Sequence, residues 1–237
     1  MFGFGKGSKN PGKDYAEGSR LYEKGDFKGA LKAFKRSAES GNAEAQYALG
    51  NMYHDGKGTM VNTAQAVVWW EGAAAQGNFK ATFNIGLAYH LGEGVMRNDD
   101  YAASMIMTAA DKGYPRAMYT LGSMYLNGQG VKKSESKALE WFLKAGDRGH
   151  ITAQYNIGVC YEEGIGTEVD YSKAIKWYEM AAKNGYAPAQ YALAIMYGDG
   201  KGVKNNEREA MKWLEKASAQ GYDDATSLLK EYRELKD

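Results

Sequence analysis

Two histidines, His54 and His90, and the single cysteine, Cys160, are the side chains of this 237-residue sequence best suited to bind a metal ion or act as a nucleophile. Structural zinc sites use four cysteine or histidine ligands, and this chain has few of either. One cysteine cannot form an intrachain disulfide. No Ser-His-Asp or Cys-His-Asn arrangement can be derived from the sequence. We therefore expect no metal, no cofactor and no enzymatic activity.

The two histidines lie 36 residues apart, at matching places of an internal repeat. On neighbouring helices they would be about 8–10 Å apart, too far to share a metal without a third ligand. Ordinary surface histidines and a pH-sensitive contact are both open interpretations. Cys160 matches methionines and an alanine in the other repeats, which predicts a buried thiol rather than a nucleophile.

Three carboxylates, Glu162, Glu163 and Asp199, come close together in the later repeats. They could pair with a basic segment of a bound partner. Acid–base catalysis is a second interpretation, but neighbouring residues on a helix diverge by about 100°. Solvated surface charges are a third.

The elements that must position these side chains repeat every 36 residues. Alanine recurs at this interval, so equivalent positions form columns, and the alanines are Ala45, Ala81, Ala117, Ala153, Ala189 and Ala225. Glycine reaches 30 of 237 residues, and most of these glycines fall in four columns. Their excess is therefore architectural and does not mark a low-complexity segment.

The first helix of each repeat carries Ala45, Leu49 and Tyr53 on one stripe, at the spacing of an α-helix. Glycine recurs inside this helix despite its low helix propensity, which predicts a second helix packed too closely for a side chain. These glycines are Gly50, Gly86, Gly122 and Gly158, with Ala194 in the fifth repeat. A Gly-x-Gly element then ends the helix; because it follows a helix and lacks a Lys-Ser/Thr ending, it is not a phosphate loop.

The second helix begins after an N-capping residue, which is Asn62 in the first of the five repeats. Its apolar face is expected to hold Ala66, Trp69 and Ala73, with their equivalents in the other repeats. A glycine such as Gly77 closes the helix. The expected fold is an all-α, right-handed solenoid of helix pairs, and no segment shows strand periodicity.

The pattern A-x-Y-x-L-G-x-x-Y-x-x-G-x-G-V, followed by an alanine, a W-[YF] pair, two alanines and a final glycine, resembles the Sel1-like repeat family, which is related to the tetratricopeptide repeats. Gly128-Gln-Gly-Val131 with Trp141-Phe142 is close to the family pattern, whereas the second copy has Met105-Ile106 in place of the aromatic pair. The resemblance extends over about residues 14–237.

We expect a flexible arm over residues 1–13 and a single domain over residues 14–237. Within it, residues 14–44 resemble a tetratricopeptide repeat with a short inter-helix turn, because the spacing from Gly18 to Ala30 is four residues shorter than the spacing from Gly50 to Ala66. Residues 45–224 hold the five 36-residue repeats, and residues 225–237 form a capping helix.

An array of helix pairs presents a concave groove lined by its first helices, and the tetratricopeptide resemblance assigns the columns that face it. Aliphatic residues in these columns predict an apolar binding surface, with burial by the superhelix itself as the alternative. The aromatic column, which holds Phe83, Tyr119, Tyr155 and Tyr191, has two possible interpretations: packing between neighbouring helices or contact with a ligand. The predicted groove residues are Asn51, His54, Asp55, Phe83, Leu87, His90, Leu91, Tyr119, Ser123, Leu126, Asn127, Tyr155, Val159, Glu162, Glu163, Tyr191, Ile195 and Asp199.

The resemblance implies an adaptor that binds another protein or peptide. One alternative is a β-lactam-binding or β-lactam-hydrolysing enzyme of the Sel1-like type, which the single cysteine disfavours. Another is a self-associating structural or toxin-inhibiting protein, so monomer and weak homodimer both remain open. The formal net charge of +1 disfavours nucleic acid as a partner. With no signal peptide and no apolar stretch long enough to span a bilayer, a cytoplasmic location is expected.

Overall fold

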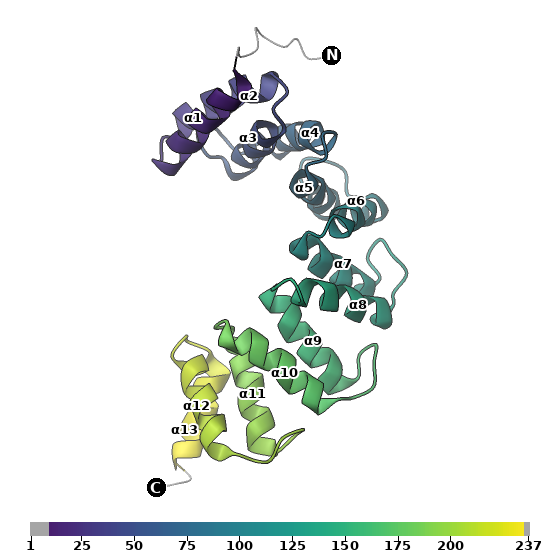
Figure 1. The fold of residues 1–237 in the computed structure, drawn as a ribbon, viewed down its shortest axis with the longest axis vertical. Coiled ribbons are helices and arrows are strands. Elements are labelled where there is room, and N and C mark those ends of the chain that lie inside the picture. The colour runs from purple at the N-terminus through teal and green to yellow at the C-terminus, as the bar shows by residue number, and fades with distance from the viewer. Residues whose placement is uncertain (1–9, 235–237) are drawn as a thin grey trace. The chain divides into compact units, whose positions relative to one another are not determined.

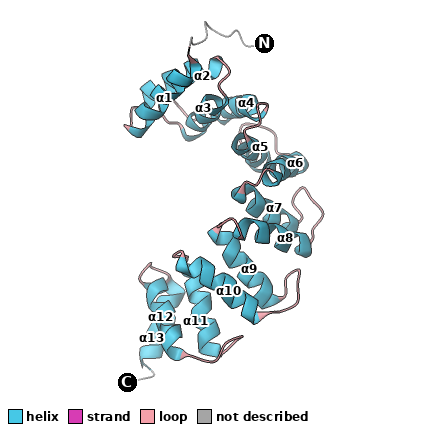
Figure 2. Cartoon of the chain, viewed as in Figure 1, coloured by secondary structure: helices cyan, strands magenta, loops and turns pink. Residues whose placement is uncertain are grey.

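The computed structural model describes residues 10–234, and every regular element within them is an α-helix (Figure 2). Within these residues, thirteen helices follow one another, and Figure 1 shows their order. The first helices of the repeats are α1 (Pro11–Glu23), α3 (Ala43–Asp55), α5 (Phe79–Leu91), α7 (Pro115–Asn127), α9 (Ile151–Glu163), α11 (Ala187–Asp199) and α13 (Asp223–Glu234). The second helices are α2 (Phe27–Glu39), α4 (Thr63–Ala74), α6 (Asp99–Asp111), α8 (Glu135–Gly146), α10 (Tyr171–Lys183) and α12 (Glu207–Ser218). The all-α repeat prediction is confirmed.

The chain forms two compact units. The first unit contains residues up to Ala117 together with residues 129–131, and the second contains residues 118–128 and those from Lys132 onward. Helices adjacent in sequence pack in pairs within each unit, for example α3 on α4 and α11 on α12. One domain over residues 14–237 stays a prediction.

The first helix begins earlier than predicted. Asn10 caps α1 by accepting a hydrogen bond from the Lys13 amide, and Pro11 opens the helix. The last three residues of the predicted arm, 11–13, are therefore helical, and residues 1–9 lie outside the described range.

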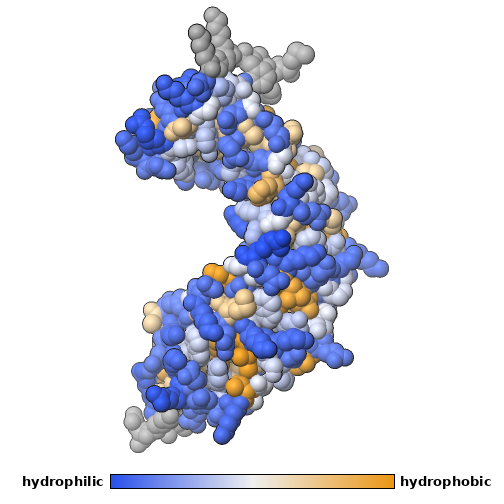
Figure 3. Space-filling model, viewed as in Figure 1, coloured by the Kyte–Doolittle hydropathy of each residue, from blue (hydrophilic) through white to orange (hydrophobic). Residues whose placement is uncertain are grey.

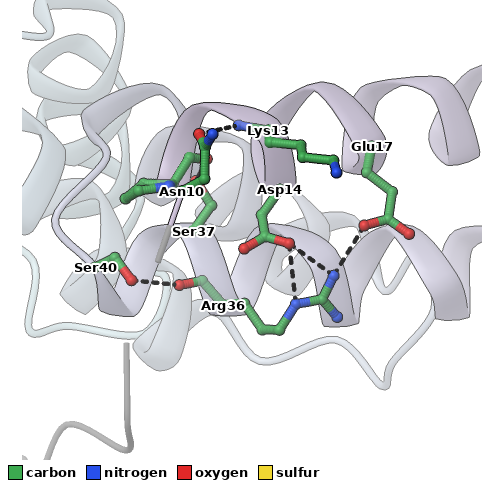
Figure 4. Close-up of polar contacts among 8 residues, drawn as sticks. Asn10, Lys13, Asp14, Glu17, Arg36, Ser37 and Ser40 are labelled. Carbon is green, nitrogen blue, oxygen red and sulfur yellow. Dashed lines mark hydrogen bonds and ion pairs between the residues drawn. The ribbon is translucent and has the colours of Figure 1, made fainter. Parts of the chain in front are cut away.

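The first helix pair has the predicted short turn. Only residues 24–26 separate α1 from α2, whereas residues 56–62 separate α3 from α4. Arg36 of α2 ties the pair together, because its guanidinium donates to Asp14 at 2.9 Å and to Glu17 at 3.0 Å on α1 (Figure 4).

The glycine column inside the first helices is confirmed as a point of close approach. A Cβ atom added at Gly50 would lie 2.5 Å from the ring of Trp70, and one added at Gly122 would lie 2.6 Å from the ring of Phe142. A large side chain of the second helix thus lies directly on the first helix. In the fifth repeat Ala194 faces Leu214, and both are buried.

The expected apolar face of the second helix omits its most deeply buried aromatic residue. Trp70 is only 3% exposed and is the aromatic residue that covers Gly50, while Trp69 is less deeply buried and packs toward the preceding repeat. In later repeats Phe142 and Tyr178 take the place of Trp70. The third and fourth residues after Ala66 both lie on its side of the helix, and packing on Gly50 selects Trp70.

Buried glutamines hold successive repeats together. The side-chain amides of Gln46 and Gln190 donate to the backbone carbonyls of Ala38 and Ala182, at 3.2 and 3.1 Å. Their own carbonyl oxygens accept from Gln76 and Gln220 respectively, each at 2.8 Å.

Gln154 occupies the same column, but its buried Oε1 atom has no hydrogen-bond partner. The residue in the column of Gln76 and Gln220 is here Asn184, whose shorter side chain donates only to the Met180 carbonyl at 2.8 Å. An unsatisfied buried acceptor costs about 1–3 kcal/mol, and this repeat lacks the hydrogen bond that Gln46 and Gln190 receive in theirs.

Asn184→Gln is expected to raise the free energy of unfolding by about 1 kcal/mol. The longer amide can donate to Gln154 and still reach the carbonyl four residues earlier, as Gln76 and Gln220 do in their repeats. Chemical denaturation followed by circular dichroism measures the change. Gln220→Asn is the reverse substitution at the equivalent position and should lower the free energy of unfolding by a similar amount. Equal unfolding midpoints for both variants and wild type would refute a role for this hydrogen bond.

Gly122→Ala is expected to lower the free energy of unfolding by about 1–2 kcal/mol, because the clash with Phe142 outweighs the better helix propensity of alanine. Gly122→Ala combined with Phe142→Leu recreates the Ala194–Leu214 pair of the fifth repeat. Thermal or chemical unfolding of wild type, both single variants and the double variant gives a double-mutant cycle. The double variant should be more stable than the sum of the two single effects predicts, whereas additivity would argue against direct contact.

Candidate functional site

The first unit has a hollow of about 560 Å³ between the first helices of neighbouring repeats, called here the α3–α5 hollow. Helices α1, α3, α4 and α5, the loop after α5 and the start of α7 all contribute to its wall. The lining residues are Tyr22, Tyr47, Asn51, His54, Asp55, Trp70, Asn84, Leu87, Ala88, Leu91, Glu93 and Arg116. A smaller hollow of about 370 Å³ shares Tyr22, Tyr47 and Asn51 with it, so the surface continues along α1 and α3.

Five of the predicted groove residues meet in this hollow: Asn51, His54, Asp55, Leu87 and Leu91. Leu91 is 59% exposed, whereas Leu87 is half-buried. The aliphatic wall is therefore partly open to solvent, as an apolar contact surface requires.

Phe83 does not line the hollow, although its column predicted a surface position. It is only 2% exposed, its ring packs edge-on against Tyr114 at 5.3 Å, and the Arg116 guanidinium carbon lies 5.6 Å from the ring centroid. The phenylalanine thus packs inside the first unit, between α5 and residues 114–116, and packing accounts for its place in the column.

The floor of the hollow is fixed by Asn51. The Oδ1 atom of Asn51 accepts from the indole nitrogen of Trp70 at 3.0 Å and from Asn84 Nδ2 at 3.1 Å. One side chain of α3 is therefore held by residues of α4 and α5. The sequence analysis did not assign Trp70 to the site, because it is a core residue. It did not assign Asn84, because the equivalent positions also hold alanine and threonine and so show no shared polar character.

His54 lies between two carboxylates at the edge of the hollow. Its Nδ1 atom is 2.9 Å from Asp55, its Nε2 atom is 3.7 Å from Glu93, and its ring centroid is 5.6 Å from that of Trp70. Glu93 comes from the loop after α5, which sequence reasoning did not connect with His54. The arrangement offers one imidazole and two acceptor groups to a bound hydrogen-bond donor or cation.

His90 has a different environment, so the two histidines do not act together. Its Nδ1 atom lies 2.7 Å from Asp99, which Arg97 also contacts at 2.7 Å. The hydrogen bond from Arg97, and to a smaller extent the one from His90, lowers the pKa of the Asp99 carboxyl. These contacts tie the end of α5 to the start of α6. Among residues 10–234, no group of three potential ligands is placed to hold a metal ion.

The aromatic column of the second unit packs against the turns that join its repeats. Tyr119 stacks on His150 with ring centroids 4.7 Å apart, and Tyr155 meets Tyr186 at 5.4 Å. Tyr191 repeats this contact with Tyr222, also at 5.4 Å. Burial raises the pKa of Tyr155. The inter-repeat contacts account for this column, as the packing interpretation expected.

The three predicted carboxylates of the second unit differ in their contacts. Glu162 accepts a hydrogen bond from the Tyr178 hydroxyl at 2.7 Å, and Asp199 lies 3.2 Å from Lys201. Glu163 is exposed. Glu162 is therefore occupied by an internal contact. The remaining predicted residues of this unit are Ser123, Leu126, Val159 and Ile195, which are half-buried, and Asn127, which is exposed.

Cys160 is a core residue, as predicted. It is 3% exposed, and burial raises its pKa to about 11, so the thiol is protonated at neutral pH. A protonated, enclosed thiol is a poor nucleophile. A separate finding concerns membranes: none of the helices between residues 10 and 234 is long and apolar enough to cross one.

Comparison with known proteins matches most of the chain to one family. Five Sel1 repeats cover residues 43–78, 80–114, 115–150, 151–186 and 187–222, and a tetratricopeptide repeat covers residues 15–59. The repeat resemblance is thereby confirmed, including the different first unit. No curated protein matches the chain.

Similar solved structures agree with this match. A protective antigen of uropathogenic Escherichia coli strains that displays an SLR fold is 30% identical with a TM-score of 0.89, covering 92% of this chain and 48% of the antigen. This chain therefore spans about half the length of that antigen. A Sel1 repeat protein from Oxalobacter formigenes is also 30% identical, with a TM-score of 0.82 and coverage of 91% and 86%. An immunity protein from Pseudomonas aeruginosa is 25% identical, with a TM-score of 0.51. The match covers 77% of this chain and 66% of the immunity protein.

Cys160 is expected to resist alkylation by iodoacetamide at pH 7.5 in the native protein and to react fully after denaturation, because the thiol is both buried and protonated. Mass spectrometry of the intact protein measures the modified fraction. Free glutathione in the same tube serves as the reactivity control. Rapid labelling of the folded chain would show an accessible thiolate and reopen the nucleophile interpretation.

Proposed function

The chain belongs to the Sel1 repeat family, and we propose that it is a protein-interaction module whose α3–α5 hollow binds a segment of another protein. Repeat folds of this kind are typical protein–protein interaction scaffolds. The observation that carries the proposal is the partly open aliphatic wall of the hollow, where Leu91 is 59% exposed beside Leu87.

The composition of the hollow supports a peptide or helix as the occupant. Leu87 and Leu91 supply apolar contact area, while Asp55, Glu93 and Arg116 supply charges of both signs around it. Protein interfaces combine an apolar centre with a polar rim in this way. Trp70 and Asn51 hold the floor in one arrangement, so the surface is largely formed before a partner arrives.

Catalysis has little support from the same residues. The β-lactam-directed alternative depends on paired cysteines, whereas this chain has only Cys160. Its thiol is buried in the core of the second unit. A nitrocefin hydrolysis assay gives the direct test of that alternative, and we expect no turnover above the uncatalysed rate.

Toxin inhibition is a narrower form of the proposed binding function. It is supported by the likeness to the Pseudomonas aeruginosa immunity protein, at 25% identity and a TM-score of 0.51. Inhibition of a toxin by binding would likewise need an accessible protein-binding face and no catalytic residues. The experiment below therefore tests both forms, and the identity of the captured protein distinguishes them.

Leu87→Glu combined with Leu91→Glu is expected to weaken binding of a specific partner at least tenfold, because two carboxylates would be buried against the apolar part of the partner. Quantitative affinity capture from a lysate of the source organism, followed by binding measurements on the enriched protein, gives the ratio. Met180→Glu is the matched control: Met180 is an exposed apolar residue of α10, outside the hollow.

All variants must keep the wild-type melting temperature for the comparison to count. Loss of one protein with the double leucine variant, and its retention with Met180→Glu, would support the proposal. Equal recovery by all three proteins would refute a role for the α3–α5 hollow. Light scattering over a range of concentrations tests self-association: a dimer abolished by the leucine variant would assign the hollow to a second copy instead.

A further inference from the structure

Three apolar side chains project from two loops of the first unit. Met60 is 86% exposed and Val61 is 66% exposed on the loop between α3 and α4, and Met96 is 89% exposed on the loop between α5 and α6. Side chains this exposed contribute almost nothing to the hydrophobic core. We call these three residues the methionine edge.

The two loops are neighbours in space. A Cβ atom added at Gly94 would lie 2.5 Å from the backbone nitrogen of Ala64, so the loop that carries Met96 rests on the first turn of α4. Met60 and Val61 directly precede this same turn. Both loops therefore place their apolar side chains around the start of α4.

The fold does not require apolar residues at these positions. In the column of Met60 and Met96, the later repeats have Lys132, Glu168 and Lys204. Their loops still begin with the same left-handed glycines, at Gly128, Gly164 and Gly200. The second unit thus shows that charged residues are compatible with the loop, and the two methionines need an explanation other than folding.

The helices beside the methionine edge have an unusual charge pattern. Neither α4 nor α6 contains lysine or arginine, whereas α8, α10 and α12 each contain at least two. The charged residues of α4 and α6 are all acidic: Glu71, Asp99, Asp100 and Asp111. Arg97, the basic residue nearest to Met96 in sequence, is already paired with Asp99.

Both helices also carry exposed apolar side chains. Val68 of α4 and Tyr101 of α6 are each 40% exposed. Most of the molecular face drawn in Figure 3 is hydrophilic, with apolar colour confined to patches. The cations on the two loops are paired with acidic residues, since Lys57 lies 3.6 Å from Asp55 and Arg97 lies 2.7 Å from Asp99. An exposed apolar group on loops next to helices whose charged residues are all acidic is complementary to a segment that presents both apolar and basic side chains.

We propose that the methionine edge, with the exposed faces of α4 and α6, is a second docking surface that binds a protein segment carrying aliphatic or aromatic residues together with lysine or arginine. Methionine suits such a surface because its flexible side chain adapts to different apolar partners. An anionic membrane is disfavoured as the occupant, since the neighbouring helices supply carboxylates and no cations. The surface is independent of the α3–α5 hollow, because Met60, Val61 and Met96 are not among the residues that line it.

The test uses the full chain and a random peptide library displayed on phage. Peptides selected on the wild-type protein are synthesised, and their affinities are measured by fluorescence anisotropy for wild type and for the Met60→Lys, Met96→Lys double variant. The substitutions copy the lysines of later repeats, so the melting temperature should not change. Glu168→Lys is the matched control, because it changes the net charge by the same two units in the same column of the second unit.

We expect one group of selected peptides to combine apolar and basic residues and to bind the double methionine variant at least tenfold more weakly. The same group should bind the Glu168→Lys control and the Leu87→Glu, Leu91→Glu variant as tightly as wild type. Peptides lost only with the leucine variant bind the hollow, as the proposed function expects; a selection that contains only such peptides would overturn this second surface. Selection of acidic peptides, or of none that distinguishes the methionine variant, would also overturn it.

Two further measurements exclude other occupants. Co-sedimentation with phosphatidylcholine–phosphatidylserine vesicles that is lost in the methionine variant would identify a lipid surface and refute a protein segment. Concentration-dependent mass that is lost in the same variant would identify a second copy of this chain, which also refutes the proposal. We expect neither effect.

Discussion

Contact between the two helices of each repeat is the constraint on which the remaining structure depends. A large side chain of the second helix lies on a glycine of the first, as Trp70 does on Gly50, and leaves no room for a Cβ atom. The small residues on either side of this contact, Ala66 and Ala73, are completely buried. Because this contact holds the two helices together, folding depends on few of the surface residues of each repeat. The remaining positions are free to differ from one repeat to the next.

The same contact also connects the fold to the candidate binding site. The Trp70 ring fills the space above Gly50, and its indole nitrogen donates to Asn51 on the floor of the hollow. A residue of the core therefore determines how a surface side chain is presented. In the second unit Tyr178 has the corresponding position over Gly158, and its hydroxyl donates to Glu162. One architectural contact thus gives an amide-lined hollow in one repeat and an occupied carboxylate in another.

The fold could be predicted from the sequence because its signals are local and occur five times. Helix ends depend on residues a few positions apart, such as Asn62 with the amide of Gln65, and every repeat confirms the register. The face of the second helix was misjudged where two tryptophans are adjacent, because both satisfy an apolar pattern and only packing against Gly50 separates them.

The candidate site could be predicted only in part. Assigning columns to the groove found both Leu87 and Leu91. Leu91 stands out because its equivalents in the other four repeats are all polar, whereas the column of Leu87 also holds valine and isoleucine. Contacts between distant residues were not accessible to it: Glu93 approaches His54 from a loop 39 positions later, and Phe83 is buried by its packing against Tyr114. A uniform 36-residue period also contains no signal for a division into two compact units.

Differences between repeats are the strongest guide to where recognition occurs, because equivalent positions share one backbone environment. Among residues 10–234, six exposed large hydrophobic side chains lie between Met60 and Tyr101 and three lie in the second unit. The second unit places lysine or glutamate where the first has Met60 and Met96. A folding requirement would act equally on all five repeats, so folding does not account for this concentration of apolar surface, and we attribute it to the proposed partner contacts. The α3–α5 hollow and the methionine edge both lie in the first unit, which is therefore the part of the molecule where partner contacts are best sought.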